Sequence, residues 1–291
     1  MATVVDQPAP ATARQGSPLW TFVKRNPTIV IGGSILAILA LMAIFAPLIT
    51  GDPLRMTPAQ RLRPPSEAWW FGTDQYGRDL FARTIYGARV SLFVGISVAL
   101  VASFVGLMLG LVCGYFRRVD AIVMRIMDGI MAIPAILLAI ALITLTRPGL
   151  VVVLIAIVIP EVPRIVRLVR SVVLSVREQP YVESAIAGGT RGFKLLFRHI
   201  LPNTLAPLIV QATYVCASAM LVEASLSFLG AGVPPEIPSW GNIISQGRTF
   251  FQLAPWSILI PGAFLTVTIL AVNLLGDGLR DRLDPRLSRR L

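Results

Sequence analysis

Histidine and cysteine, the side chains that most often build metal sites and nucleophilic centres, are scarce in this chain of 291 residues. The one histidine is His199, and the two cysteines, Cys113 and Cys216, lie inside apolar runs, where small packing residues are expected. A zinc site or a cysteine–histidine nucleophile cannot be assembled from this set. The sequence also lacks a phosphate-binding loop of the form GxxxxGKS or GxxxxGKT. We therefore predict no catalytic residue, no metal site and no cofactor held by this chain.

The composition indicates a membrane protein. Apolar residues make up 55% of the chain and charged residues only 14%, whereas roughly 25% of an average soluble protein is charged. The net charge is +11, but most arginines lie between apolar runs, which favours orientation in a bilayer over binding of nucleic acid. The expected fold class is all-α and polytopic, with the lipid bilayer as a partner and no nucleic acid.

Long charge-free runs define the predicted spans. They are 28–50, 90–116, 129–146, 149–160, 203–222 and 249–276. All but 149–160 reach the roughly 17–25 residues that a spanning helix needs. The apolar pattern after 160 continues, so a single helix is predicted over 150–176, with its basic end in water. The sequence thus predicts six transmembrane helices.

Lysine and arginine are divided unevenly between the two sides of these spans. The richer set of segments includes both termini, and the positive-inside rule places it in the cytoplasm. The predicted organisation is a cytoplasmic tail (1–27), a first transmembrane helix (28–50), an extracytoplasmic segment (51–88), a core of five transmembrane helices (89–278) with a cytoplasmic loop at 178–202, and a cytoplasmic tail (279–291).

Acidic residues inside the spans would be needed by an ion-coupled carrier. Glu223 is expected near the outer end of its span and Asp277 at the inner end of the last one. Asp128 is expected near the inner start of its span, paired with Arg125 at i−3. None of these three acids is placed to form a proton relay.

Glu161 is the one acid predicted to lie deep, roughly 18 Å from the outer start of its helix. It stands between Pro160 and Pro163, where a kink or break is expected. Two hypotheses remain for its role. The favoured one is a local pair with Arg164 at i+3, and the second is a place in the lining of a translocation pathway.

The cytoplasmic connection 179–203 reads QPYVESAIAGGTRGFKLLFRHILPN. Pro180 suits the first turn of a helix, where Glu183 is also favoured by the helix dipole. Gly188 and Gly189 predict the end of that helix. A second short helix, ended by Pro202, is predicted to be amphipathic and to lie at the membrane surface. Its apolar face would be Phe193, Leu196, Phe197 and Ile200, opposite Arg191, Lys194 and Arg198. An interfacial anchor and a docking surface for another protein are both possible, and the paired helices favour docking.

A motif in this connection resembles the EAA-type coupling motif of ABC importer permeases. The matching residues are Glu183, Ser184, Ala185, Gly189, His199, Leu201 and Pro202. The family normally has alanine where Ser184 stands. Other strings resemble the C-type permease of oligopeptide, dipeptide and nickel importers, the oligopeptide permease most of all. They contain Asp74, Gly77, Arg78, Asp79, Arg125, Asp128, Pro134, Glu223, Trp240, Gly241 and Asp277.

The resemblance implies a type-I ABC importer permease fold in a bacterial inner membrane. It also implies three kinds of partner: a second, homologous permease, two ATP-binding subunits that hold ATP and magnesium, and an extracytoplasmic substrate-binding protein. The helix from Tyr181 to Gly188 would sit in a groove on an ATPase subunit, with Glu183 as its polar anchor. The implied cargo is oligopeptides, with dipeptides, glutathione or nickel as alternatives and an ion-coupled carrier as the competing class.

The external segment before residue 88 is long for a connector. Trp69, Trp70 and Phe71 are predicted to form an interfacial aromatic belt. The charged residues that follow have helix-compatible spacings and are expected to pair with one another. These are Asp74, Arg78, Asp79 and Arg83.

Overall fold

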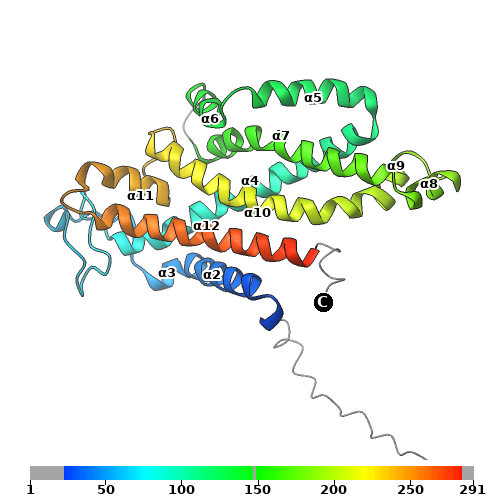
Figure 1. The fold of residues 1–291 in the computed structure, drawn as a ribbon. Helices are drawn as coiled ribbons and strands as arrows, with labels where there is room; N and C mark the ends of the chain where they lie inside the picture. The colour runs from blue at the N-terminus through cyan, green and yellow to red at the C-terminus, as the bar shows by residue number, and fades with distance from the viewer. Residues whose placement is uncertain (1–22, 147–148, 284–291) are drawn as a thin grey trace, which may run out of the picture.

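A computed structural model describes residues 23–146 and 149–283 of the chain (Figure 1). The elements are α2 (Pro27–Ile44), α3 (Ala46–Ile49), η1 (Pro58–Gln60), α4 (Leu80–Tyr115), α5 (Arg117–Met131), α6 (Ala135–Thr144), α7 (Leu150–Arg177), α8 (Pro180–Ala187), α9 (Gly192–Leu195), η2 (Leu196–Ile200), α10 (Leu201–Phe228), α11 (Trp240–Gly247), η3 (Arg248–Phe250) and α12 (Trp256–Leu283). Within these ranges the only β-type pairing is an isolated bridge between Thr73 and Asp79. The all-α prediction is confirmed.

Four helical segments of the described chain are long and apolar enough to cross a bilayer: α2, α4, α12 and the continuous stretch Gly192–Phe228. The pair α5 and α6 adds a fifth if its two halves count as one span. The predicted helix over 150–176 is present as α7, which has 28 residues and would measure about 42 Å. Helix α7 is long enough to cross a bilayer but is not among these apolar helices, because charged side chains interrupt its sequence. The predicted count of six is therefore not reproduced by length and hydropathy alone.

The third predicted span is not one straight helix. The run 129–146 contains the end of α5, a corner at residues 132–134 and α6, and the two helices meet at an angle of 87°. Pro134 stands at the corner, where it disfavours helical backbone in the residue before it. A charge-free run therefore predicted the apolar character correctly but missed the break.

The second span begins earlier than its apolar run. Helix α4 starts at Leu80 because the Asp79 carboxylate accepts a hydrogen bond from the backbone N–H of Phe81, at 2.9 Å, and so caps the helix. Its 36 residues would span about 54 Å, well beyond the hydrocarbon thickness. The first turns of α4 thus occupy part of the segment that was predicted to be a connector.

Helices α4 and α7 pack closely along a stripe of glycines. Gly106, Gly110 and Gly114 recur every four residues and so lie on one face of α4. A β-carbon added at these positions would lie 2.5–2.7 Å from side-chain carbons of Ile165, Val169 and Val173 on α7. Small residues at this spacing let two helices approach closely in a membrane. This interface belongs to the larger of two buried apolar clusters, which also includes Leu111, Ile157 and Leu226.

The second short helix of the 179–203 connection does not end at Pro202. Instead α9 passes through the π-helical turn η2 directly into α10, and Pro202 lies in the first turn of α10, where proline is tolerated. The predicted apolar face is also divided: Leu196 and Ile200 are buried, whereas Phe193 and Phe197 are exposed. The wider π turn changes the spacing that brings residues to one face.

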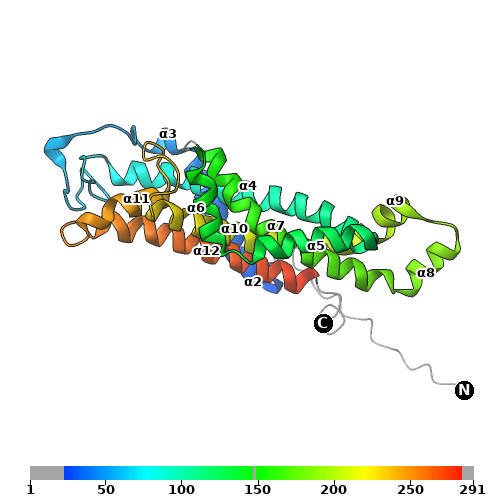
Figure 2. The same ribbon diagram turned by 90° about the horizontal axis from the view of Figure 1, so that it is seen from above.

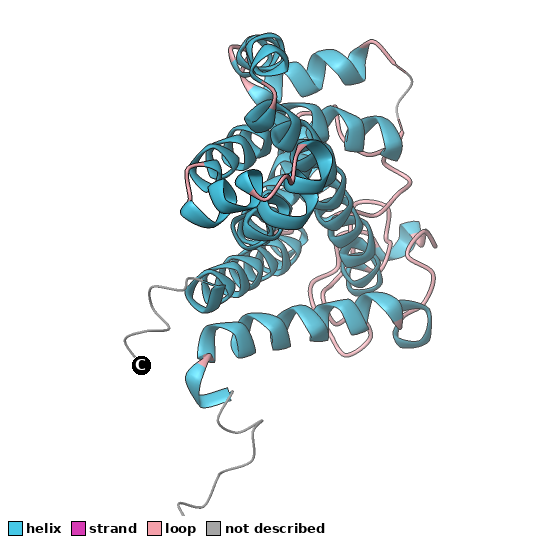
Figure 3. Cartoon of the chain, turned by 90° about the vertical axis from the view of Figure 1, so that its right-hand side faces the viewer, coloured by secondary structure: helices cyan, strands magenta, loops and turns pink. Residues whose placement is uncertain are grey.

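The long helices form an elongated bundle with α11 and the irregular segment between α3 and α4 at one end and α8 at the other (Figures 1 and 2). Helix α2 lies at the edge and crosses the others at a steep angle (Figure 3). The first turn of α2 meets the last turns of α12, since a β-carbon on Gly278 would touch Thr28 and Ile29. The beginning of α2 and the end of α12 are therefore on the same side of the bundle.

Candidate functional site

The predicted coupling helix is present as α8, and it projects from the end of the bundle (Figure 2). Pro180 occupies its first turn, together with Glu183. Only Val182 is fully buried, and it joins the main apolar cluster. Tyr181, Glu183 and Ser184 are exposed. The helix is thus attached along one edge and presents its other side to the surroundings.

Gly189 ends α8 in the left-handed conformation, with φ +86°. The Thr190 N–H donates to the Ala185 carbonyl and the Gly189 N–H donates to the Ile186 carbonyl, both at 2.9 Å. These two bonds form a Schellman cap, which satisfies carbonyls left free at the helix end. The predicted helix stop at this glycine is confirmed, and the cap fixes the direction in which the chain turns.

Tyr181 connects α8 to the start of α10. Its hydroxyl donates to the His199 carbonyl at 3.3 Å and accepts a bond from the Asn203 side-chain amide at 2.9 Å. The same amide also donates to the His199 carbonyl at 2.8 Å. Leu201 and Pro202 lie in the first turn of α10 next to this cluster. Of the motif residues, Tyr181 and His199 are therefore brought together, and Asn203 is a member of this cluster that the motif alone did not identify.

A second attachment joins this region to α4. The Gly192 N–H donates to the Tyr115 hydroxyl at 3.0 Å, and the Arg177 guanidinium donates to the Gly114 carbonyl at 2.9 Å. Neither Tyr115 nor Arg177 was predicted to take part. These bonds, together with those of Tyr181, tie the region of α8 and α9 to the neighbouring ends of α4, α7 and α10.

Glu183 makes no ion pair within the described residues. Ser184 donates to the Pro180 carbonyl at 2.8 Å, one turn earlier in the same helix. The carboxylate of Glu183 thus remains available on the exposed face of α8. That arrangement is compatible with a polar anchor for a partner and equally with a solvated acid in a first turn.

Glu161 lies inside α7, which remains one continuous helix through Pro160 and Pro163. The residue is 3% exposed, and its carboxylate lies 3.6 Å from the Arg164 guanidinium. The Ser218 hydroxyl of α10 donates to the same carboxylate oxygen at 3.3 Å. The predicted pair with Arg164 is confirmed, and Ser218 is an additional partner that sequence spacing could not show. A kink or break was predicted between the prolines, and the helix is not broken there.

Asp128 does not pair with Arg125. Its carboxylate accepts from Arg167 of α7 at 2.6 Å, while Arg125 is exposed on α5. The prediction considered only neighbours on the same helix and missed a partner brought close by the packing of α5 on α7. A stronger cross-link lies further along the same interface, where Arg170 of α7 makes two bonds with Asp120 of α5.

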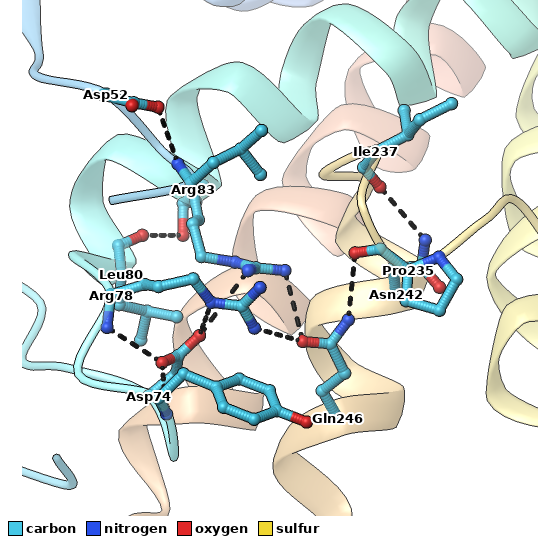
Figure 4. A network of polar contacts seen from close by, with 12 residues as sticks. Asp52, Asp74, Arg78, Leu80, Arg83, Pro235, Ile237, Asn242 and Gln246 are labelled. Atoms are coloured by element: carbon cyan, nitrogen blue, oxygen red, sulfur yellow. Dashed lines mark hydrogen bonds and ion pairs between the residues drawn. The ribbon is translucent and has the colours of Figure 1, made fainter. Parts of the chain in front are cut away.

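At the end of the bundle opposite α8, Asp74 holds two arginines (Figure 4). The Arg78 Nε donates to Asp74 at 2.6 Å, and Arg83 lies 3.5 Å from the same carboxylate oxygen. Gln246 of α11 accepts from Arg78 at 2.6 Å and from Arg83 at 3.3 Å. The expected pairing of charges is confirmed for these three residues, and Gln246 is the member that the sequence did not indicate.

The remaining charged residue of this string, Asp79, serves as the cap of α4. Burial raises the pKa of the Asp79 carboxyl, although hydrogen bonds from the backbone of Phe81 and Ala82 act in the opposite direction. Gly77, with φ +71°, forms the turn that precedes it. The nearby aromatic residues pack on the helices: Phe71 contacts both Phe81 and Phe264.

Glu223 is fully buried where α10 meets α11. It accepts hydrogen bonds from Ser227 at 2.9 Å and from Ser239, the cap of α11, at 2.8 Å. The next residue, Trp240, donates from its indole to the Thr84 carbonyl of α4 at 3.0 Å. Gly241 packs against Ala224, where a β-carbon would come within 2.6 Å. These residues of the C-type permease resemblance therefore hold α4, α10 and α11 together. Asp277, by contrast, is exposed on α12.

Among residues 23–146 and 149–283, no group of three or more histidine, cysteine, aspartate or glutamate side chains could hold a metal ion. What the arrangement offers is an exposed helix tied to one end of several long apolar helices.

Residues 106–289 match the family described as the inner membrane component of binding-protein-dependent transport systems. The chain belongs to this family. Residues 17–65 also match the N-terminal transmembrane domain of oligopeptide transport permease C. The resemblance to C-type permeases is thus confirmed, and the chain is a multi-pass membrane permease.

Individual relatives agree with this assignment. A probable peptide ABC transporter permease of Sinorhizobium fredii is 57% identical to this permease over 92% of each chain. A dipeptide transport system permease of Alkalihalophilus pseudofirmus is 46% identical over 91% of this chain and 88% of its own. Among solved structures, the inward-facing MetNI methionine ABC transporter has a TM-score of 0.49 and 20% identity, with coverage of 67% of this chain and 94% of that chain.

Proposed function

We propose that this permease forms half of the translocation pathway of an ATP-driven peptide importer in a bacterial inner membrane. Its partners would be a second, homologous permease, two ATPase subunits that bind ATP and magnesium, and an extracytoplasmic binding protein. Relatives named as peptide and dipeptide permeases support peptides as the cargo, and dipeptides fit as well as longer peptides. Both termini would be cytoplasmic.

The observation that carries this proposal is the attachment of α8. An exposed helix that carries the exposed acid Glu183, joined by Tyr181 to α10 and continuous in sequence with α7, is suited to receive movement from another protein. Rigid helices pass such a displacement on as a rigid-body motion. Glu183 would anchor α8 in a groove on the ATPase subunit, and Gly189 would hold the angle of the turn.

A cavity near the α8 end supports a half-pathway. It has a volume of about 710 Å³ and lies between α7, α10 and α12. Its lining includes Asn203, Gln211 and Arg280 beside apolar residues. We propose that the second permease closes this open side, so that the pathway forms between the two subunits.

Reconstituted vesicles test the proposal. Peptide uptake should require ATP, the ATPase subunits and the binding protein, and it should persist when ion gradients are abolished. The purified permease alone should hydrolyse no ATP, because its sequence has no phosphate-binding loop. Uptake by the permease alone, driven by an ion gradient, would establish the competing class of secondary carrier. Uptake of nickel or glutathione in place of peptides would retain the mechanism and change the cargo.

A further inference from the structure

A polar pocket of about 580 Å³ lies at the outer end of the permease, far from α8. One wall comes from the outer segment, with Arg61, Gln75 and Tyr76, and the other from the end of α11 and η3. That second wall consists of Ser245, Gln246, Arg248, Thr249 and Phe250. Arg61 and Arg248 are exposed, and they belong to segments far apart in the sequence. A ligand that engaged both arginines would connect the outer segment to α11.

The floor of this pocket is closed. Gln246, which lines it, is held from behind by Arg78 and Arg83 (Figure 4). Arg83 is 1% exposed and Asp74 is 5% exposed, so this layer is sealed from solvent. A ligand that enters from outside must leave by the same opening. The pocket is therefore suited to holding a group and not to passing cargo through.

The charge around the pocket is strongly positive. Two arginines stand on its walls and two lie beneath Gln246, and Asp74 is the one carboxylate that pairs with any of them in the described chain. Within reach of Asp74, the Nε and Nη1 atoms of Arg83 are buried without a hydrogen-bond partner. Buried positive charge without full compensation is costly, and a nearby anion would reduce that cost.

We propose that this pocket receives an aspartate or glutamate side chain from the docking face of the extracytoplasmic binding protein. The inference rests on the proposed function for the existence of that partner, and it adds the place and the chemistry of the contact. The Arg61 side chain makes no hydrogen bond to the described residues. Arg248 donates from one nitrogen to the Phe228 carbonyl at 3.3 Å and lies 5.2 Å from the centroid of the Phe228 ring, and its other nitrogens make no hydrogen bond to the described residues. Two guanidinium groups on opposite walls suit a carboxylate.

The closed floor favours a partner's side chain over the carboxylate of a free peptide. A transported peptide must continue towards the membrane, whereas the base of this pocket is closed by Gln246 and the buried arginines beneath it. A docked side chain would instead pull η3 towards the outer segment. Because α11 is joined to α10 through Glu223 and Ser239, docking at this pocket would also displace α10, a long helix of the pathway.

The test uses the complete transporter in vesicles, with uptake measured against the concentration of its binding protein. Arg61→Gln and Arg248→Gln should each raise the half-saturating concentration by roughly two- to fivefold, which is the range expected for an exposed ion pair. Maximal uptake at saturating binding protein should be retained. The difference from the unsubstituted transporter should shrink as salt is raised, because exposed charges are screened. Arg55→Gln is the matched control: Arg55 is exposed on the same segment but does not line the pocket.

Three results would overturn the inference. An unchanged half-saturating concentration in both variants, with the complex intact, would show that the pocket does not take part in docking. An equal shift in the Arg55→Gln control would reduce the effect to overall charge. If the variants weakened uptake of peptides with a free carboxyl terminus but not of amidated ones, at saturating binding protein, the ligand would be the peptide itself. If uptake by the unsubstituted transporter did not need a binding protein at all, the proposed function itself would be wrong, whatever the two arginine variants showed.

Discussion

Gly110 of α4 lies so close to Val169 of α7 that a β-carbon on the glycine would come within 2.7 Å of the valine Cβ. The β-carbon of valine cannot move away by rotation about χ1, so any relief requires the two helices to separate. Because Gly106 and Gly114 make the same contact one turn away on either side, the whole interface depends on the absence of side chains on this face of α4.

Gly110→Ala should therefore destabilise the permease, although alanine favours helix. We expect a loss of about 1–3 kcal/mol, the usual cost of adding a methyl group to a tightly packed site. The melting temperature of the purified subunit in detergent measures this effect. Gly129→Ala is the control, since Gly129 of α5 has open space around it, and there the better helix propensity should leave stability unchanged or raise it by up to about 1 kcal/mol. Equal melting temperatures for the two variants would contradict the packing argument.

Local patterns in the sequence predicted local structure well. The length of α7, the proline that starts α8 and the glycine that ends it all follow from neighbouring residues, and the structure has each of them. Those patterns could not predict contacts between helices. Asp128 has an arginine at i−3, yet it pairs with Arg167 because α5 folds back on α7 after the corner at Pro134.

In the candidate site, too, local structure was predicted and contacts between helices were not. The helix α8 and its end at Gly189 were predicted from the coupling motif, because they depend on residues close in sequence. It could not reveal that Tyr115 of α4 holds Gly192, or that Ser218 of α10 reaches Glu161. Gln246 has no chemical signature in the sequence, and its role depends on α11 being placed over the two buried arginines.

The ion pair of Asp120 and Arg170 should stabilise the contact of α5 with α7. Its side chains are 19% and 31% exposed and make two hydrogen bonds, whereas those of Asp128 and Arg167 are 58% and 46% exposed and make one. A double-mutant cycle with Asp120→Asn and Arg170→Gln should give a coupling energy of about 1 kcal/mol or more. The cycle for the more exposed pair should give less than about 0.5 kcal/mol. The reverse order of coupling energies, from thermal melting, would show that burial does not set their strength.

Glu161→Gln should affect assembly more than transport. Glutamine can still accept the bond from Ser218, and Arg164, whose side chain is 43% exposed, can remain solvated without its acid. We expect somewhat less assembled complex, with uptake per complex within about twofold of the unsubstituted transporter for peptides of any charge. Arg164→Gln is the control for the other half of the pair. A selective change for charged peptides in Glu161→Gln alone would instead place this carboxylate in the pathway.

Glu183→Lys should leave the permease folded and weaken its capture of the ATPase subunit. The side chain is exposed, so the fold loses only the favourable position of an acid in a first helical turn, about 0.3–1 kcal/mol. At a polar anchor the reversed charge would repel groups arranged to receive a carboxylate. The paired measurement is the membrane level of the permease and the ATPase subunit recovered with it. Normal recovery would show that Glu183 is only a solvated surface acid.

Gly189 gives the sharpest test of coupling, because its substitution separates backbone conformation from bulk. No atom lies within 4 Å of the position a β-carbon would take, so side-chain size alone costs nothing there. The φ of +86° is the obstacle, and it costs ordinary L-residues about 1–2 kcal/mol and β-branched ones more. Asparagine tolerates the left-handed region far better. Gly189→Val should therefore swing α8 out of line and sharply lower both ATPase recovery and peptide uptake, while Gly189→Asn should keep most of each. The membrane level of the permease should remain normal in both variants, since the residue lies outside the long apolar helices. Equal, normal uptake for valine and asparagine would mean that the angle of this turn does not matter for coupling. Equal loss in both would point to a contact that needs the bare backbone, and the cap would then be incidental.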